Sequence, residues 1–252
     1  MTTNNKIKTL TKTFEIIEVL KSNNGGTISD ISSLTGMTPS TVHRHLATLR
    51  DHEYVVQQGN TYDLSFRFVD ISKTIRNRDV AFELAEETVS ELAETTGERA
   101  QFFIEEHGKA VYVCLDTGKH GVLTDSHIGK TVPLHATGGG KAILAHLPKD
   151  RVNKIIEETG LSELTSNTVT SKKELLEELS TIRNRGYSTN KEEYSKGSYA
   201  VGVPVLNEKK GVIGALSVTG PRIRMENILS SDELPNLLMG TANELSLNIS
   251  YA

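Results

Sequence analysis

The hydrophobic positions in the first 65 residues follow two different spacings. Apolar residues recur every three or four positions in three short segments, which is the spacing of a helix with one buried face. These positions are Leu10, Phe14, Ile17 and Leu20, then Ile28, Ile31 and Leu34, then Val42, Leu46 and Leu49. Two β-prone runs follow within residues 53–64, on either side of Gly59-Asn60, a dipeptide that favours a hairpin turn. The pattern predicts three helices and then a β-hairpin.

Residues that cap helices predict where two of these helices begin and end. Thr27 precedes the second helix and Asp30 follows three positions later, as in a capping box. Gly36 ends that helix and allows a sharp turn. Thr38 then caps the third helix, and Pro39 takes its first position, where a missing N–H is harmless. Two helices joined by a tight turn and followed by a hairpin predict a winged helix-turn-helix over residues 6–65.

The third helix has a polar face that suits the major groove of DNA. It presents small hydroxyl groups and one arginine, and no carboxylate occurs before Asp51. The planar fork of Arg44 matches the edge of guanine, and hydroxyl groups at the start of a helix suit phosphate or base edges. The predicted DNA contacts, including two from the hairpin, are Thr38, Ser40, Thr41, His43, Arg44, Gln58 and Asn60. His45 points toward the buried flank and is expected to pack. The alternative interpretation is an exposed helix of a protein–protein module.

Helical and strand patterns alternate less regularly in the rest of the chain. Residues 66–81 are predicted to form a connecting helix, with Phe68, Ile71 and Ile75 on its inner face. Further helices are expected at 82–96, 142–146, 149–159, 172–185 and 234–250, and strands at 100–105, 110–115, 187–191, 199–206 and 212–219. Strands at both ends of a segment with helices between them predict an α+β domain with a mostly antiparallel sheet over residues 82–252.

Charge separates the two predicted domains. The chain has a net charge of −4, yet residues 1–80 hold ten basic and eight acidic side chains, and the remainder is acidic. A slightly basic head on an acidic body suits a DNA-binding module attached to a larger domain. Cys114 is the only cysteine, which excludes an internal disulfide and favours a reducing compartment. The chain begins without a signal-peptide pattern and has no apolar run long enough to span a bilayer, so a cytoplasmic protein without a membrane partner is expected.

Five stretches in this order resemble the IclR family of transcriptional regulators: TPSTVHRHLATL, YDLSFRFVDI, PLHATGGGKAILAHLP, LTSNTVTSKKELLEELSTIRNRGYSTNKEEYSKG and GALSVTGP. The final residues, ANELSLNISYA, look like those of archaeal members. The resemblance implies a winged-helix head, a linker helix and a GAF-like effector domain. It also implies dimers, often paired into tetramers, that bind palindromic operator DNA and respond to a small organic acid, aromatic acid or sugar-derived metabolite. Both repressors and activators occur in the family.

The resemblance also implies where an effector would bind. Carried over residue by residue, the positions are Gly138, Gly139, Asn190, Ala200, Ser217 and Thr219. Amide groups of a glycine-rich helix start could bind a carboxylate, and Ser217 and Thr219 share one strand face and could donate hydroxyl protons. Some members have an acidic residue in place of Asn190 and a cysteine in place of Ala200, which weakens the case for a glyoxylate- or pyruvate-type ligand. The alternative is a glycine-rich turn with ordinary strand hydroxyls.

Other kinds of site are not supported. HATGGGKA lacks the first glycine and the final Ser or Thr of a phosphate-binding loop. The histidines do not fall at metal-ligand spacing, and Cys114 lies in an apolar strand with no nameable base. We therefore expect no metal, no cofactor and no enzymatic activity. The leading hypothesis is a metabolite-responsive, sequence-specific DNA-binding regulator. The rivals are an architectural DNA-binding dimer whose C-terminal domain serves assembly only, and an enzyme with a GAF-like fold, which leaves the polar helix unexplained.

Overall fold

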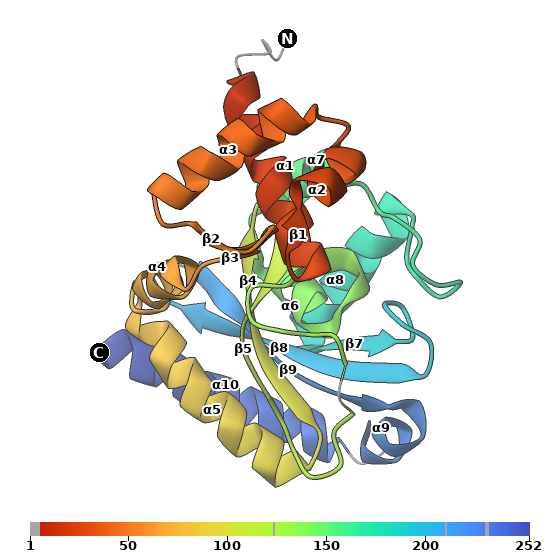
Figure 1. The fold of residues 1–252 in the computed structure, drawn as a ribbon. Coiled ribbons are helices and arrows are strands. Elements are labelled where there is room, and N and C mark those ends of the chain that lie inside the picture. The colour runs from red at the N-terminus through yellow and green to blue at the C-terminus, as the bar shows by residue number, and fades with distance from the viewer. Residues whose placement is uncertain (1–5, 123, 210, 230–231) are drawn as a thin grey trace. The chain divides into compact units, whose positions relative to one another are not determined.

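A computed structural model describes residues 6–122, 124–209, 211–229 and 232–252. The chain divides into two compact units, Met1–Arg78 and Asp79–Ala252 (Figure 1). Among the described residues, no helix combines the length and the apolar character that crossing a bilayer requires.

The first unit is a three-helix head with a hairpin. Its helices are α1 (Lys8–Asn23), α2 (Ile28–Thr35) and α3 (Pro39–Asp51), and its hairpin is β2 (Val55–Gln58) and β3 (Thr61–Leu64). A short strand, β1 (Gly26–Thr27), pairs antiparallel with β3 and was not predicted. The capping box at Thr27 and Asp30, the left-handed Gly36 and the Thr38–Pro39 helix start are all confirmed. The core of this unit comprises Ile16, Leu20, Ile31, Met37, Val42, Leu46, Leu49, Val55 and Tyr62.

Three of the predicted inner positions in this head are wrong. Leu10 and Phe14 of α1 are 52% and 64% exposed, and Leu34 of α2 is 60% exposed. The buried stripe of α1 consists instead of Ile16 and Leu20. Apolar residues cover more than one side of α1, and a three-helix core can bury only one of them, so periodicity alone did not identify the correct side.

The helix expected over residues 66–81 is shorter than predicted. It is α4 (Arg67–Arg76), and the next helix, α5 (Val80–Thr96), starts separately because the side chain of Asp79 caps it by accepting the N–H of Ala81. The ring of Phe68 packs on Tyr54 of the head, with ring centroids 5.4 Å apart. The predicted inner positions Ile71 and Ile75 are exposed, and α4 has no buried residue.

The second unit is built on one sheet with the strand order β6-β5-β4-β9-β8-β7, and all its pairings are antiparallel. The strands are β4 (Arg99–Glu106), β5 (Lys109–Thr117), β6 (Thr131–Pro133), β7 (Ser188–Lys191), β8 (Ser198–Asn207) and β9 (Gly211–Pro221). The helices are α5, α6 (Gly138–His146), α7 (Lys149–Thr159), α8 (Lys172–Arg185), α9 (Arg222–Leu229) and α10 (Glu233–Tyr251), with a 3-10 turn η1 (Leu134–Ala136). The predicted α+β class is confirmed, whereas β6, η1 and α9 were not foreseen.

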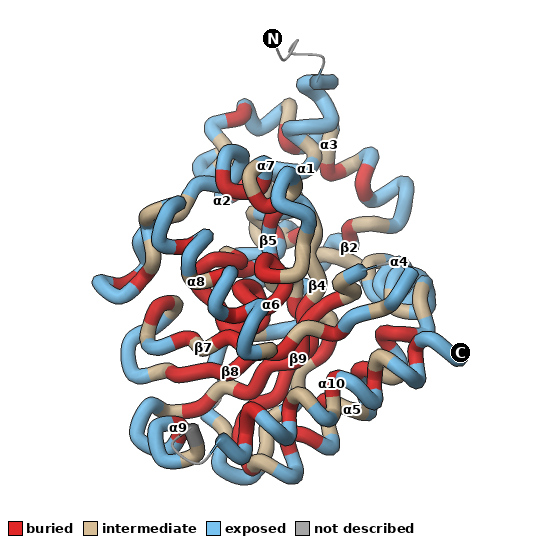
Figure 2. The backbone as a smooth tube through the Cα atoms, turned by 180° about the vertical axis from the view of Figure 1, so that it is seen from behind, coloured by how far each residue is buried: buried red, intermediate tan, exposed pale blue. Residues whose placement is uncertain are grey.

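The two faces of this sheet have different helical covers (Figures 1 and 2). α5 and α10 lie side by side on one face, over a core that includes Phe102, Cys114, Val201 and Leu216. α6, α7 and α8 cover part of the other face, with Phe103 and Tyr112 in their core. α6 begins at Gly138, four residues before the predicted start, because the side chain of Thr137 caps it by accepting the N–H of Gly140. A cavity lined in part by Phe103, Tyr112 and Gly138 lies on this second face.

Candidate functional site

The outer face of α3 carries most of the predicted DNA contacts. Thr38, Ser40, His43 and Arg44 are exposed and Thr41 is half-buried. The hydroxyl of Thr38 lies 3.2 Å from that of Ser40 and 2.9 Å from that of Thr41, so the helix begins with three hydroxyl groups in one cluster. Hydroxyl groups and free amides at a helix start are a suitable site for phosphate.

Arg44 is the strongest candidate for reading a base. Among the described residues its guanidinium has no partner within hydrogen-bonding or ion-pairing distance, and its side chain is exposed, so its donors remain available. The Nδ1 atom of neighbouring His45 lies 2.8 Å from the hydroxyl of Thr13, and burial lowers the pKa of this histidine. His45 therefore packs within the head as expected, and Arg44 points away from it.

The hairpin offers two further polar groups. Gln58 and Asn60 are both exposed at its tip. Gln57 is used internally, since its side chain accepts a hydrogen bond from Arg50 (2.7 Å) and donates to the carbonyl of Gly59 (2.9 Å). The Arg50–Gln57 contact joins the end of α3 to the hairpin, so the two candidate surfaces are held in one arrangement.

A cavity of about 350 Å³ lies in the second unit, on the face of the sheet where α6 begins. Two rows of residues cross the strands there. Asn190, Ala200, Thr219 and Arg99 are direct partners across β7, β8, β9 and β4. The next row is Ser188, Gly202, Ser217 and Gln101. Because strand side chains alternate between faces, both rows point to the same side.

The structure brings five of the six predicted effector positions to this cavity. Gly138, Asn190, Ala200, Ser217 and Thr219 all line it. Gly139 does not line it, and a Cβ there would overlap the ring of Phe103, so this glycine is needed for the packing of α6 on the sheet. The six positions come from α6 and from the three consecutive strands β7, β8 and β9.

Hydrogen bonds limit what these groups can offer a ligand. The hydroxyl of Ser217 already donates to the carbonyl of Val201 (2.8 Å), so it can only accept, and the expected donor role is wrong for this residue. Asn190 donates to the carbonyl of Ala136 and accepts the N–H of Glu193 (3.2 Å), which leaves one amide proton. The hydroxyl of Thr219 accepts from Gln101 (2.7 Å) and keeps its own proton to donate.

Several polar residues of the cavity were missed from the sequence, and two of them are buried on β4. Arg99 and Gln101 on β4 are 8% and 1% exposed, and both line the cavity beside Thr219. Thr124, Ser126 and Tyr112 line it as well. The available signal was the run RAQFF, in which Arg and Gln alternate with Ala and Phe in a strand that is otherwise apolar. Such alternation indicates a buried polar face.

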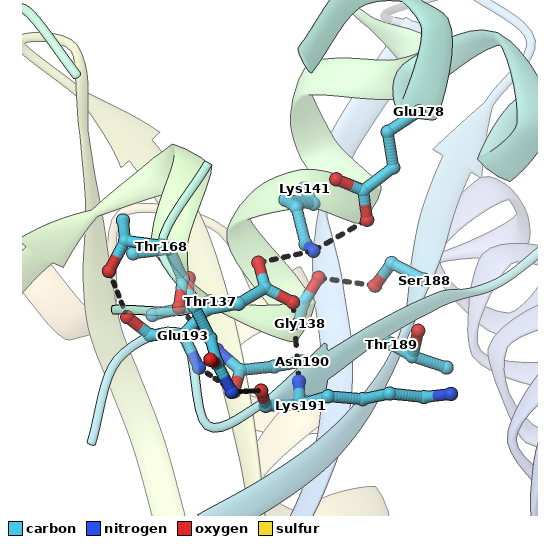
Figure 3. A network of polar contacts seen from close by, with 12 residues as sticks. Thr137, Gly138, Lys141, Thr168, Glu178, Ser188, Thr189, Asn190, Lys191 and Glu193 are labelled. Atoms are coloured by element: carbon cyan, nitrogen blue, oxygen red, sulfur yellow. Dashed lines mark hydrogen bonds and ion pairs between the residues drawn. The ribbon is translucent and has the colours of Figure 1, made fainter. Parts of the chain in front are cut away.

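A buried ion cluster lies next to Gly138 and Asn190, two residues of the cavity (Figure 3). The ammonium of Lys141 on α6 is fully buried and lies 2.5 Å from a carboxylate oxygen of Glu193 and 2.6 Å from one of Glu178. The backbone carbonyl of Glu193 accepts the hydroxyl of Thr168 (2.6 Å), and its N–H binds Asn190. Lys141 thereby ties α6 to Glu193 in the turn after β7, and the N–H of Glu193 in turn holds the side chain of Asn190 on that strand. Burial raises the pKa of Glu193, and the charge of Lys141 partly offsets this.

A winged-helix head with an available arginine, joined to a separate domain with a polar cavity, has the organisation of a transcriptional regulator. The family model for the IclR helix-turn-helix domain matches residues 9–59, and the model for the bacterial transcriptional regulator IclR C-terminal domain matches residues 72–247. The chain belongs to the IclR family of transcriptional regulators. It is a regulator and not an enzyme.

Individual relatives agree with this assignment. The chain is 32% identical to the probable HTH-type transcriptional regulator ArcR of Halobacterium salinarum, over 98% of this chain and 95% of that protein. It is 26% identical to the transcriptional repressor IclR of Escherichia coli, over 87% of this chain and 82% of that one. The crystal structure of Thermotoga maritima IclR superposes with a TM-score of 0.80 at 25% identity, covering 98% of this chain and 100% of that chain.

Proposed function

We propose that this regulator binds a specific operator sequence through α3 and the β2–β3 hairpin, and that a small metabolite in the second unit's cavity changes its operator affinity. The observation that carries the proposal is the pairing of two separate features in one chain. One is an exposed recognition helix with an available Arg44, and the other is a cavity lined by buried hydrogen-bonding groups.

The DNA part rests on the polar face of α3. Thr38, Ser40 and Thr41 would contact phosphate or base edges, His43 and Arg44 would enter the major groove, and Gln58 and Asn60 would contact the adjacent backbone or minor groove. An arginine that forms a bidentate contact with guanine is worth about 1–3 kcal/mol of discrimination against other bases.

The effector part rests on the size and chemistry of the cavity. A volume of about 350 Å³ is at the lower end of the range for small-molecule sites, which suits a metabolite rather than a large cofactor. Gly138, Asn190, Ser217 and Thr219 supply acceptors and donors, and Phe103 and Tyr112 supply apolar surface. Gly139 belongs to the proposed site only through its packing role. Organic acids, aromatic acids and sugar-derived metabolites are the classes of effector we expect.

The proposed organisation is a DNA-binding head at 6–65, a connecting segment at 66–81 and an effector-binding and assembly domain at 82–252. We further propose that the chain self-associates into dimers or tetramers, because two heads are needed to bind the two halves of a palindromic operator. Exposed apolar residues of the connecting segment, among them Phe66, Val69 and Ile75, are consistent with such contacts.

Fluorescence anisotropy on DNA from upstream of the chain's own gene, with scrambled DNA as the control, tests the proposal at about 150 mM salt. A regulator should prefer the upstream sequence by about 4 kcal/mol or more. Titration of small metabolites into that complex then tests effector control. Equal, weak binding to both DNAs would count against the operator. Specific binding that no metabolite changes would favour the architectural dimer.

A further inference from the structure

Arg99 is a buried cation whose hydrogen bonds go to neutral groups. Its Nε donates to the side-chain oxygen of Gln101 (3.2 Å), and its Nη1 donates to the hydroxyls of Thr124 and Ser126. The two N–H groups of Nη2 have no acceptor in the part of the chain that the structure describes. Arg99 is 8% exposed, and it lines the cavity.

The carboxylates nearest to it in the chain and in the cavity are paired with other cations. Glu98 precedes Arg99 and holds the guanidinium of Arg224 at 2.5 Å and 3.0 Å. Asp125 lines the cavity and lies 2.6 Å from the ammonium of Lys130. No ion pair between described residues includes Arg99.

The other deeply buried cation of this unit shows the contrast. Lys141, which is fully buried, has carboxylates of two glutamates within 2.6 Å. A buried charge without a counter-ion is costly, and proteins ordinarily pair it. The absence of such a counter-ion at Arg99 among the described residues, on the wall of a cavity, indicates that the counter-ion is part of the ligand.

We infer that Arg99 holds a carboxylate of the effector and is the residue that restricts this site to anionic ligands. The inference rests on the proposed function, and it adds a charge to a site whose six motif-derived positions are all uncharged. A guanidinium presents a planar pair of donors that fits the two oxygens of a carboxylate.

Gln101 positions both Arg99 and Thr219 for this role. Its oxygen accepts from Arg99, so its nitrogen must face Thr219, to which it donates at 2.7 Å. The Thr219 hydroxyl is then an acceptor on one side and a free donor on the other. A carboxylate at Arg99 would therefore lie beside a second donor on the adjacent strand.

The charge of the cavity favours a carboxylate over a phosphate ester. One guanidinium balances the single negative charge of a carboxylate. A phosphate dianion would need a second cation, and the other basic side chain of the lining, Lys196, is exposed, where solvent screens its charge. Asp125, which also lines the cavity, is already paired with Lys130. Phe103, Tyr112 and Val122 add apolar surface to the lining, which suits a partly apolar ligand body.

The test compares wild-type protein with Arg99→Met and Arg99→Lys, without DNA. The probes are acetate, lactate, benzoate and 3-hydroxypropanoate, each paired with its primary amide, together with phenyl phosphate. Binding is followed by thermal shift and calorimetry. At least one carboxylate should bind wild type, and its amide and the Arg99→Met variant should each lose at least about tenfold in affinity. Arg99→Lys should retain part of the affinity for the carboxylate.

A second measurement needs no ligand. Arg99→Met removes an uncompensated buried charge and fills similar space, so its Tm without ligand should be no lower than that of wild type. A large fall in Tm would assign Arg99 a structural role and overturn the inference. It would also be overturned if the amides or phenyl phosphate bind best, if carboxylates bind equally to Arg99→Met, or if no carboxylate binds. Because these assays omit DNA, a failure to bind operator is a separate result that bears on the proposed function alone.

Discussion

A Cβ atom added to Gly202 on β8 would lie 2.6 Å from the carbonyl oxygen of Gly138, the first residue of α6. Because neither glycine has a side chain, the first turn of α6 packs directly against the backbone of β8. The hydroxyl of Ser188, the partner of Gly202 on β7, donates to the same Gly138 carbonyl at 2.5 Å. This contact sets the distance between α6 and the strands and so forms one wall of the cavity.

Gly202→Ala should therefore destabilise the second unit. The backbone conformation of Gly202 is open to alanine, so the cost is steric and is expected at about 1–3 kcal/mol. Urea unfolding measures it. Gly240→Ala on α10 is the matched control, because an added Cβ there meets nothing within 4 Å. Equal stability of the two variants would contradict the close contact.

Lys141→Met should be among the most damaging single substitutions in this unit. It leaves the carboxylate of Glu193 buried without its cation, and breaking such a pair costs about 3–5 kcal/mol. Lys154→Met, which removes a surface cation 3.8 Å from Glu158, should cost less than about 1 kcal/mol. Adding Glu193→Gln to Lys141→Met should restore part of the stability. If the double variant is no more stable than the single one, the buried charge is not the cause.

Arg44→Ala should weaken operator binding by about 1–3 kcal/mol while thermal stability stays near that of wild type, because the side chain is exposed. Binding to scrambled DNA should fall much less, so specificity is lost along with affinity. Arg185→Ala, which removes an exposed arginine of the second unit, provides the control. Normal operator selectivity in Arg44→Ala would show that another residue reads the bases.

Stability should fall as the pH drops below about 6.5, the usual pKa of histidine. Burial lowers the pKa values of His135 and His146, so below that pH the unfolded chain takes up protons that the folded chain does not. The contribution of the two neutral histidines to the free energy of unfolding is complete above the pKa of histidine in the unfolded chain. It is lost as the pH falls toward the lowered pKa values of these histidines in the folded chain. Below the folded values both states are protonated, so these two histidines no longer change the free energy of unfolding with pH.

His135→Gln should reduce this pH dependence without removing it, since His146 remains. Glutamine keeps a donor for the carbonyl of Ser162, which lies 3.1 Å from Nε2 of His135. Urea unfolding at several pH values between about 5 and 7.5 measures the slope. An unchanged slope in the variant would mean that His135 titrates normally in the folded protein.

The local parts of the fold could be predicted from the sequence because their signals lie within a few residues. The Thr27–Asp30 capping box, the Gly36 turn and the bounds of α7 and α8 all depend on neighbours along the chain. The side that α1 buries depends on what packs against it, so Leu10 and Phe14 were assigned to the core although both are exposed.

The cavity could be predicted only in part, because it too depends on residues that are distant along the chain. Five of its residues could be placed by resemblance to a family motif, but nothing in the sequence states that Arg99 lies opposite Thr219. This register joins β4, which comes early in the sequence of the second unit, to β9, which comes late in it. The hydrogen bond from Ser217 to the carbonyl of Val201 depends on the pairing of β9 with β8, which the sequence also does not state, and for that reason the expected donor role of Ser217 was wrong.

The pairing of β4 with β9 also determines when the cavity forms during folding. The Gln101–Thr219 hydrogen bond closes a loop of 118 residues, so it belongs to the least local contacts in the chain. Non-local strand pairing forms slowly, because the entropy of closing a long loop is lost before the contacts are gained. A newly made chain would thus acquire its recognition helix early, from local contacts, and its ligand site only when β9 inserts between β4 and β8. During that interval the head would be folded while the cavity of the second unit is still unformed.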